Sequence, residues 1–211
     1  MNIRIKKEWR DLNINNYYDL SYIMQQILKR ESKAGRDQEH LWVLGLSNNL
    51  KLLYIELVSL GSMTESVVDP MQVFRVGLIK GAAKVIMVHN HPGKDIAFGD
   101  LKPSESDNDL TDRMIHVGEI IKIKVVEHMI ITDRFFYSYR KTGKLKELER
   151  SLKWVPSYQH KERILAEAKR IAEEKGIKKG LKKGIKKGRK EGKKEGLKEG
   201  KEKERERMVI R

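Results

Sequence analysis

The stretch VIMVHNHPGKDIAFGDLKPSESD, residues 85–107, contains the pattern that decides the fold. It begins with a short, continuous apolar run, which is typical of a strand covered on both faces. The run ends in the triplet HNH at 89–91 and a proline, and a proline-serine pair then gives a good helix start with Ser104 as the N-cap. The stretch therefore predicts a buried strand, a polar loop and a helix.

Hydrophobic periodicity on either side of this stretch predicts the remaining elements. Spacings of three and four indicate helices, and short β-branched runs indicate strands. The predicted elements are a helix at 17–30, a hairpin at 39–62 turning at Asn48-Asn49, a helix at 70–81, a strand at 83–88, a helix at 103–123 and strands at 124–132 and 135–139. This order indicates a mixed α/β domain over about residues 14–140.

The chain carries a formal charge of +15, and most of it lies at the C-terminal end. Residues 175–211 hold seventeen Lys and Arg against six Glu, which supplies +11. Glycine recurs every four residues from 176 to 200. Each glycine costs about 0.8–1 kcal/mol relative to alanine in a helix, so we expect a mobile, solvated tail that frays from a helix after Tyr158. Sequence-blind binding of this tail to nucleic acid is the open alternative.

Composition excludes several classes of site. The absence of cysteine rules out disulfides, thiol nucleophiles and the Cys-ligated zinc of deaminases. The N-terminal residues lack the apolar core of a secretory signal, and no window approaches the length of a membrane span. We therefore expect a cytoplasmic protein that does not enter a membrane, and the sequence leaves the oligomeric state open.

The residues at the end of the central strand have the spacing of a metal site. Because residues i and i+2 of a strand face the same way, His89 and His91 can direct two imidazoles to one point while Asn90 faces away. A catalytic zinc ion usually has three protein ligands and one open position. Asp107, in the first turn of the following helix, would be the third ligand. The S-x-x-D pattern of Ser104 and Asp107 is also a plain capping arrangement, and capping does not exclude ligation.

Several motifs together resemble one family. HNHP and PSESD, preceded by VSLGS and VDPMQVFRVGL and followed by HMIITDRFFYSY, are similar to the RadC-like branch of the JAB/MPN metalloprotease domains. The resemblance covers about residues 36–140 and implies the cytidine-deaminase-like fold, a mixed central sheet flanked by helices. It divides the chain into a helical lead-in (1–36), the metal-binding domain (37–140), a helical connector (141–175) and the basic tail (176–211).

The resemblance also implies the roles of the site residues. His89, His91 and Asp107 would bind Zn²⁺, Ser104 would donate to the oxyanion, and Glu39 would be the general base. Glu56, in the second strand of the hairpin, is the alternative base.

This chain departs from the family pattern between the second histidine and the aspartate, where the fifteen residues 92–106 make a longer loop. That loop contains Asp95 and Asp100 as rival carboxylates, although only Asp107 stands in the S-x-x-D context. We expect His128 to make a structural hydrogen bond in its strand, and His40 and His116 to be surface or incidental residues.

The resulting hypothesis is a zinc-dependent metallopeptidase or isopeptidase acting on a protein or peptide substrate. The alternative is a DNA-repair-associated RadC-like accessory protein that binds nucleic acid through residues 176–211 without hydrolysis. A metal-dependent nuclease has little support, because the letters HNH in that motif's name stand far apart in sequence.

Overall fold

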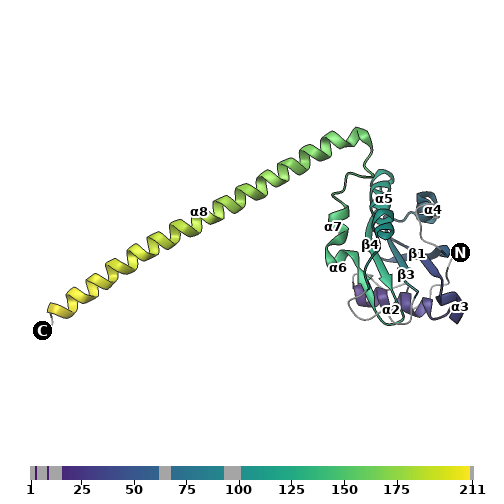
Figure 1. The fold of residues 1–211 in the computed structure, drawn as a ribbon, viewed down its shortest axis with the longest axis horizontal. Coiled ribbons are helices and arrows are strands. Elements are labelled where there is room, and N and C mark those ends of the chain that lie inside the picture. Colours follow the sequence, from purple (N-terminus) through teal and green to yellow (C-terminus); the bar gives the residue numbers. More distant parts are fainter. Residues whose placement is uncertain (1–2, 4–8, 10–15, 62–67, 93–100, 210–211) are drawn as a thin grey trace. The chain divides into compact units, whose positions relative to one another are not determined.

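The computed structural model describes residues 3, 9, 16–61, 68–92 and 101–209. By internal contacts the chain divides into two units, Met1–Val155 and Pro156–Arg211. The elements are α2 (Tyr17–Leu28), α3 (Lys33–Arg36), β1 (Glu39–Leu46), β2 (Leu52–Gly61), α4 (Pro70–Lys80), β3 (Lys84–Asn90), α5 (Glu105–Ile121), β4 (Lys124–Ile131), β5 (Phe136–Ser138), α6 (Tyr139–Thr142), α7 (Lys144–Leu148) and α8 (Ser157–Val209), most of which are labelled in Figure 1.

The first unit confirms the predicted mixed α/β fold. Its described residues form a five-stranded sheet in the order β2-β1-β3-β4-β5. Only β3 and β4 pair in parallel, and the other three pairings are antiparallel. A parallel pair needs a crossover connection, and α5 provides it. The strand that ends in the histidine pair therefore lies at the centre of the sheet.

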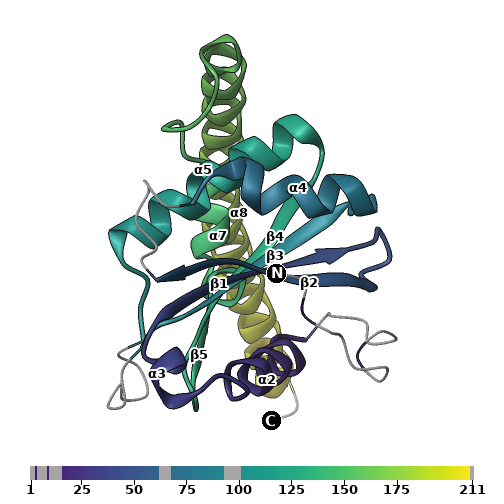
Figure 2. The ribbon, with the colours of Figure 1, turned by 90° about the vertical axis from the view of Figure 1, so that its right-hand side faces the viewer.

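Helices cover both faces of the sheet, with α4 and α5 on one side and α2 on the other (Figure 2). The side chains of β3 point alternately to these two faces. Val85 and Met87 join Phe74 of α4 in the core cluster on the α5 side. Ile86 and Val88 join the apolar face of α2 in the opposite cluster. Two-sided burial explains why the strand is continuously apolar, as predicted.

The turn between β1 and β2 differs in detail from the prediction. The amide of Leu50 donates to the carbonyl of Ser47 at 3.1 Å, which closes the turn. The residue with positive φ is Leu50, at 61°, and neither asparagine has a positive φ. Asn48 and Asn49 therefore occupy the turn without using the left-handed conformation for which asparagine is favoured.

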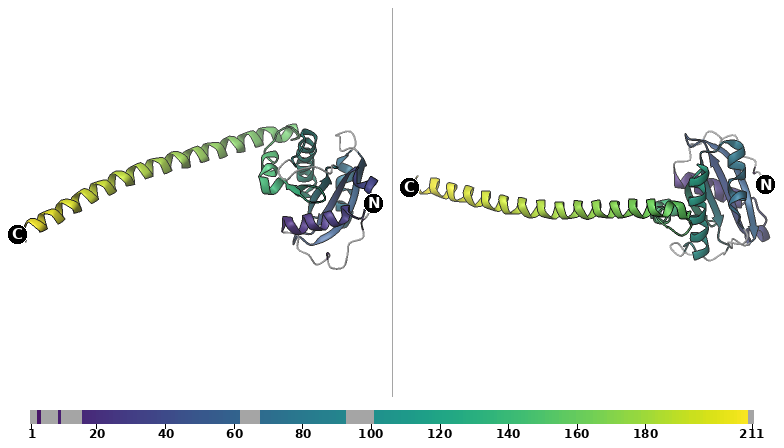
Figure 3. Two further views of the ribbon diagram at one scale, coloured as in Figure 1. Left: turned by 60° about the horizontal axis from the view of Figure 1, so that its bottom comes forward. Right: turned by 90° about the horizontal axis from the view of Figure 1, so that it is seen from above.

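The structure corrects the expectation that glycine would break the tail. The helix α8 runs without interruption from Ser157 to Val209 and includes all seven glycines (Figure 3). The residues between the glycines are mostly Lys, Glu and Leu, which are good helix formers. Ion pairs one turn apart support the helix, including Lys187 with Glu191 and Arg170 with Glu174. Among the helices that the structure describes, none has the length and apolar character needed to cross a membrane.

Candidate metal centre

Three side chains from two elements meet where β3 ends. His89 is the next-to-last residue of β3, His91 follows the strand, and Asp107 lies in the first turn of α5. Their potential ligand atoms all lie within 4.8 Å of one another. The His89 and Asp107 side chains are 0% and 4% exposed, and that of His91 is 22% exposed. The cluster is thus enclosed on most sides and accessible beside His91.

The distances in this cluster fit a small divalent cation. Nε2 of His89 lies 3.0 Å from Nε2 of His91 and 3.3 Å from Oδ1 of Asp107. Nε2 of His91 lies 3.3 Å from Oδ2 of Asp107. Tetrahedral zinc with bonds of about 2.0–2.1 Å separates neighbouring ligand atoms by about 3.3 Å. The two histidines approach different oxygens of Asp107, and the three residues together could hold a metal ion.

Electrostatics favour the forms of His89 and Asp107 that could bind a metal ion. Burial lowers the pKa of His89 more than the Asp107 carboxylate raises it. Burial alone would raise the pKa of Asp107, but hydrogen bonds from both histidines and from Ser104 hold it well below its ordinary value. A neutral imidazole and an ionised carboxylate are the forms that coordinate a cation.

Asp107 also forms a capping box with Ser104. Oγ of Ser104 accepts from the Asp107 amide at 3.1 Å and donates to Oδ2 of Asp107 at 2.7 Å. The Ser104 amide donates to the same oxygen at 2.8 Å. Oδ2 of Asp107 accepts the capping hydrogen bonds, and Oδ1 points at His89. The same carboxylate can therefore cap α5 and bind a metal ion. In this arrangement the Ser104 hydroxyl proton is held by Asp107, so donation to an oxyanion would require that hydroxyl to rotate.

Glu39 and Glu56 lie on the same face of the sheet as His89 but in different places. Glu39 is the first residue of β1, two residues before Leu41, which pairs with His89. Its charge acts on His89 and raises the pKa of that imidazole slightly against the larger effect of burial. Glu56 is buried farther along the sheet, where its carboxylate lies 3.5 Å from the Arg75 guanidinium. This geometry favours Glu39 as the base, which stays a prediction. The rival carboxylates Asp95 and Asp100 lie outside the described residues.

Asn90 faces away from the cluster, as predicted, and holds the start of β1 in place. Its side-chain oxygen accepts from the amide of His40 at 2.7 Å, and its side-chain nitrogen donates to the carbonyl of Gln38 at 3.0 Å. These two contacts lie on either side of Glu39 in the chain. The residue between the two histidines therefore ties the backbone of Glu39 to the end of β3, a role that we did not predict from the sequence.

A second set of side chains makes hydrogen bonds on the Nδ1 side of His89, away from the metal cluster. Nδ1 of His89 lies 2.8 Å from Nε2 of His128 in β4, and Nδ1 of His128 lies 2.5 Å from Oγ1 of Thr111 in α5. The predicted structural hydrogen bond of His128 is thus present. Thr111 did not stand out in the sequence. The available signal was its position four residues after Asp107, on the buried side of an amphipathic helix.

Two further histidines correct our expectation of surface residues. His40 is buried and stacks on Trp42, with ring centroids 5.0 Å apart. His116 is buried in α5, where its Nε2 lies 3.1 Å from a carboxylate oxygen of Asp112. Neither residue belongs to the metal cluster.

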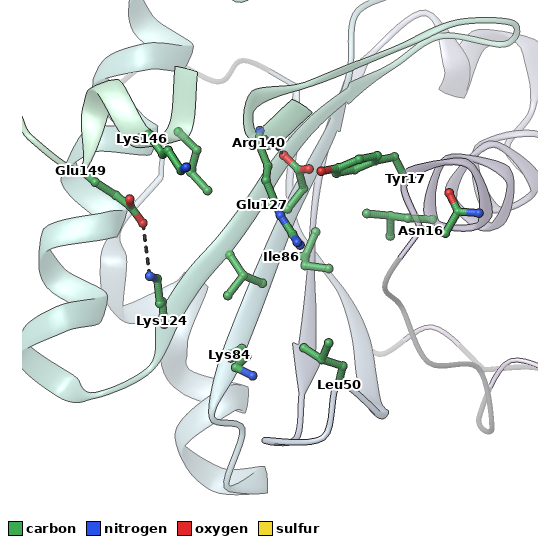
Figure 4. A pocket seen from close by; sticks show the side chains of 13 residues that line it. Asn16, Tyr17, Leu50, Lys84, Ile86, Lys124, Glu127, Arg140, Lys146 and Glu149 are labelled. Atoms are coloured by element: carbon green, nitrogen blue, oxygen red, sulfur yellow. Dashed lines mark hydrogen bonds and ion pairs between the residues drawn. The ribbon is translucent and has the colours of Figure 1, made fainter. Parts of the chain in front are cut away.

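A separate cavity of about 410 Å³ is lined by residues that include Tyr17, Ile86 and Lys146 (Figure 4). Ile86 belongs to the face of the sheet opposite to that of His89. Several of its charged groups already interact with protein groups. Lys124 pairs with Glu149 at 3.3 Å, and Lys84 donates to a backbone carbonyl. The Glu127 carboxylate accepts from Ser138 at 2.6 Å and from a backbone amide. These contacts distinguish the cavity from the metal cluster, in which ligand atoms converge.

Comparison with known proteins agrees with this geometry. The family model described as "RadC-like JAB domain" matches residues 14–144, more than half of the chain. Among curated proteins, the chain is similar to the UPF0758 protein of Desulforudis audaxviator, with 41% identity over 107 residues, covering 51% of this chain and 44% of the relative. It is also similar to the UPF0758 protein of Desulforamulus reducens, with 42% identity over 116 residues, covering 55% and 49%. The chain thus spans about half the length of the curated relatives that it matches.

Proposed function

Because the chain belongs to the RadC-like JAB family, we propose that it is a zinc-dependent metallopeptidase or isopeptidase. The observation that carries the proposal is the cluster of His89, His91 and Asp107, whose candidate ligand atoms all lie within 4.8 Å of one another. Two imidazoles and one carboxylate leave a fourth position open, which is the arrangement of catalytic rather than structural zinc.

The residues around the cluster supply the other requirements of amide hydrolysis. A zinc ion at this position would lower the pKa of a bound water to about 7 and polarise a substrate carbonyl. Glu39 is the group that takes the proton and later delivers it to the leaving amine. Ser104 is one rotamer change away from donating its hydroxyl proton to the substrate oxygen. Neither role requires a covalent intermediate.

Metal analysis of the purified 211-residue chain, beside a His89→Ala/His91→Ala variant, tests the proposal. We expect about one zinc per wild-type chain and loss of that zinc in the variant. The loaded protein is then incubated with a peptide mixture that includes lysine-branched peptides, and new termini are identified by mass spectrometry. Cleavage should stop on addition of a chelator and return with zinc. Equal zinc contents in the two proteins, or cleavage that persists in the variant, would contradict the proposal.

We also propose that residues 176–211 bind nucleic acid without sequence preference. The observation in its favour is the net charge of +11 between 175 and 211, carried on a helix whose described side chains from 176 to 193 are all exposed. Binding driven by lysine–phosphate contacts should weaken steeply with salt. A chain lacking residues 176–211 should lose affinity for a fluorescent duplex at low salt. Unchanged affinity would refute this second function.

A further inference from the structure

The hydrogen bonds behind His89 form a chain that links two of the three metal ligands. It runs from Nδ1 of His89 to His128 at 2.8 Å and from His128 to Thr111 at 2.5 Å. Oγ1 of Thr111 in turn donates to the backbone carbonyl of Asp107 at 2.5 Å. The side chains of the first three residues are fully buried, so water does not compete for these contacts. The chain thus connects β3, β4 and α5 around the metal position.

The direction of every bond in this chain follows from which nitrogen of His89 binds metal. Nε2 faces Asp107 and His91, so a bound cation requires the lone pair of Nε2 and places the proton on Nδ1. Nδ1 must then donate to Nε2 of His128, which leaves the His128 proton on its own Nδ1. That proton is donated to Oγ1 of Thr111, whose hydroxyl proton is donated to the Asp107 carbonyl.

The opposite direction is favoured when no cation is bound. A protonated Nε2 of His89 then donates to the Asp107 carboxylate, 3.3 Å away, and Nδ1 becomes an acceptor. His128 must donate from Nε2 and accept at Nδ1, and the Thr111 hydroxyl must turn from the Asp107 carbonyl toward His128. Each group keeps the same number of protons in both states, so only their positions differ.

We propose that His128 and Thr111 are positioning residues whose hydrogen-bond chain sets the orientation and tautomer of His89, and that the chain reverses direction when zinc binds. The inference rests on the proposed zinc site. The fit around His128 supports it, because the His128 ring stacks on the buried ring of Tyr139 with centroids 4.8 Å apart and an interplanar angle of 17°. The imidazole is therefore held in its plane, and a change of tautomer is the available response.

The direct test is the tautomer of His128, which does not touch the metal. Long-range ¹H–¹⁵N spectra of the whole chain with labelled histidine should show the His128 proton on Nε2 without zinc and on Nδ1 with one equivalent of zinc. A purely structural role would leave this signature unchanged. The same tautomer in both states would overturn the proposed reversal.

Zinc affinity measured by competition with a chromophoric chelator tests the positioning role. His128→Phe keeps the ring but removes both nitrogens, and we expect the dissociation constant to rise about 10- to 100-fold. Thr111→Val is nearly isosteric with threonine and should raise it by about 10-fold, at the low end of the same range. Thr111→Ser, the matched control, keeps the hydroxyl and should bind zinc nearly as tightly as the wild type.

The outcomes separate this inference from the proposed function. If the wild-type chain binds no zinc, both the proposed function and this inference are refuted. If the wild type binds zinc and the folded His128→Phe and Thr111→Val variants bind it equally tightly, only the positioning role is refuted. If His128→Phe fails to fold, the comparison of Thr111→Val with Thr111→Ser decides, since the smaller substitutions differ chiefly in the hydroxyl.

Discussion

Replacing Ser104 with alanine tests whether the start of α5 is part of the metal centre. The change removes the two contacts of the Ser104 hydroxyl with Asp107, in which it accepts from the Asp107 amide at 3.1 Å and donates to Oδ2 of Asp107 at 2.7 Å. The backbone amide of Ser104 still donates to Oδ2 at 2.8 Å. Half of the capping box therefore survives, and Asp107 loses one of the groups that hold its carboxylate.

The size of the effect follows from these contacts. Loss of a serine N-cap costs about 1 kcal/mol, and a hydrogen bond to an ionised group contributes about 1.5–3 kcal/mol. The two contacts share one side chain and one partner, so their contributions do not add fully. We expect a total loss of about 2 kcal/mol, which lowers the melting temperature of a domain of this size by about 4–8 °C.

The assay is thermal unfolding of the metal-free chain followed by tryptophan fluorescence, because Trp42 lies in the core of the first unit. Ser106→Ala is the matched control: Ser106 is exposed like Ser104 and its hydroxyl lies 2.9 Å from that of Ser104, but the hydrogen bonds to Asp107 come from Ser104. It should change stability by less than about 0.5 kcal/mol. If the Ser104→Ala and Ser106→Ala variants have the same melting temperature, the assigned role of the Ser104 hydroxyl is wrong.

Four other perturbations test the fold and the site. In Gly45→Ala the new Cβ would lie 1.9 Å from Cε1 of Tyr54, so overpacking should cost about 1–3 kcal/mol or more, measured by urea unfolding. Asn90→Ala leaves the buried amide of His40 at the start of β1 without its side-chain partner, which should cost about 1–3 kcal/mol in the same assay. Because the pKa of Asp107 is lowered in the folded protein, its ionisation stabilises the fold above about pH 4, and the stability difference between wild type and Asp107→Asn should shrink as the pH falls toward 3. Glu39→Gln should keep its zinc, measured by metal analysis, but lose about 10²- to 10⁴-fold in the rate of peptide cleavage.

The parts of the site that could be predicted are those specified by local geometry. The convergence of His89 and His91 follows from strand alternation, and the placement of Asp107 follows from the cap at Ser104. Both signals lie within a few residues of the side chains concerned. The greater length of the 92–106 loop does not disturb them, because the end of β3 and the start of α5 are positioned by the core.

The parts that could not be predicted depend on pairings between distant elements. His128 reaches His89 because β3 and β4 pair in parallel with Met87 opposite His128. This register cannot be deduced from one sequence, and Thr111 gains its role only through it. The helix of the tail does not follow from glycine propensity alone, because the lysines and glutamates between the glycines favour a helix and Lys187 pairs with Glu191 one turn later.

The uneven enclosure of the three ligands has a kinetic consequence. Within the described residues, His89 and Asp107 are almost fully covered, and His91 lies at the opening. An incoming cation meets His91 first, and a departing cation leaves it last. The buried pair would then set how tightly the ion is held, and movement of the partly exposed His91 ring would set how quickly it is exchanged. A protein that exchanged its ion slowly at such a site would reflect its past exposure to metal rather than the momentary supply.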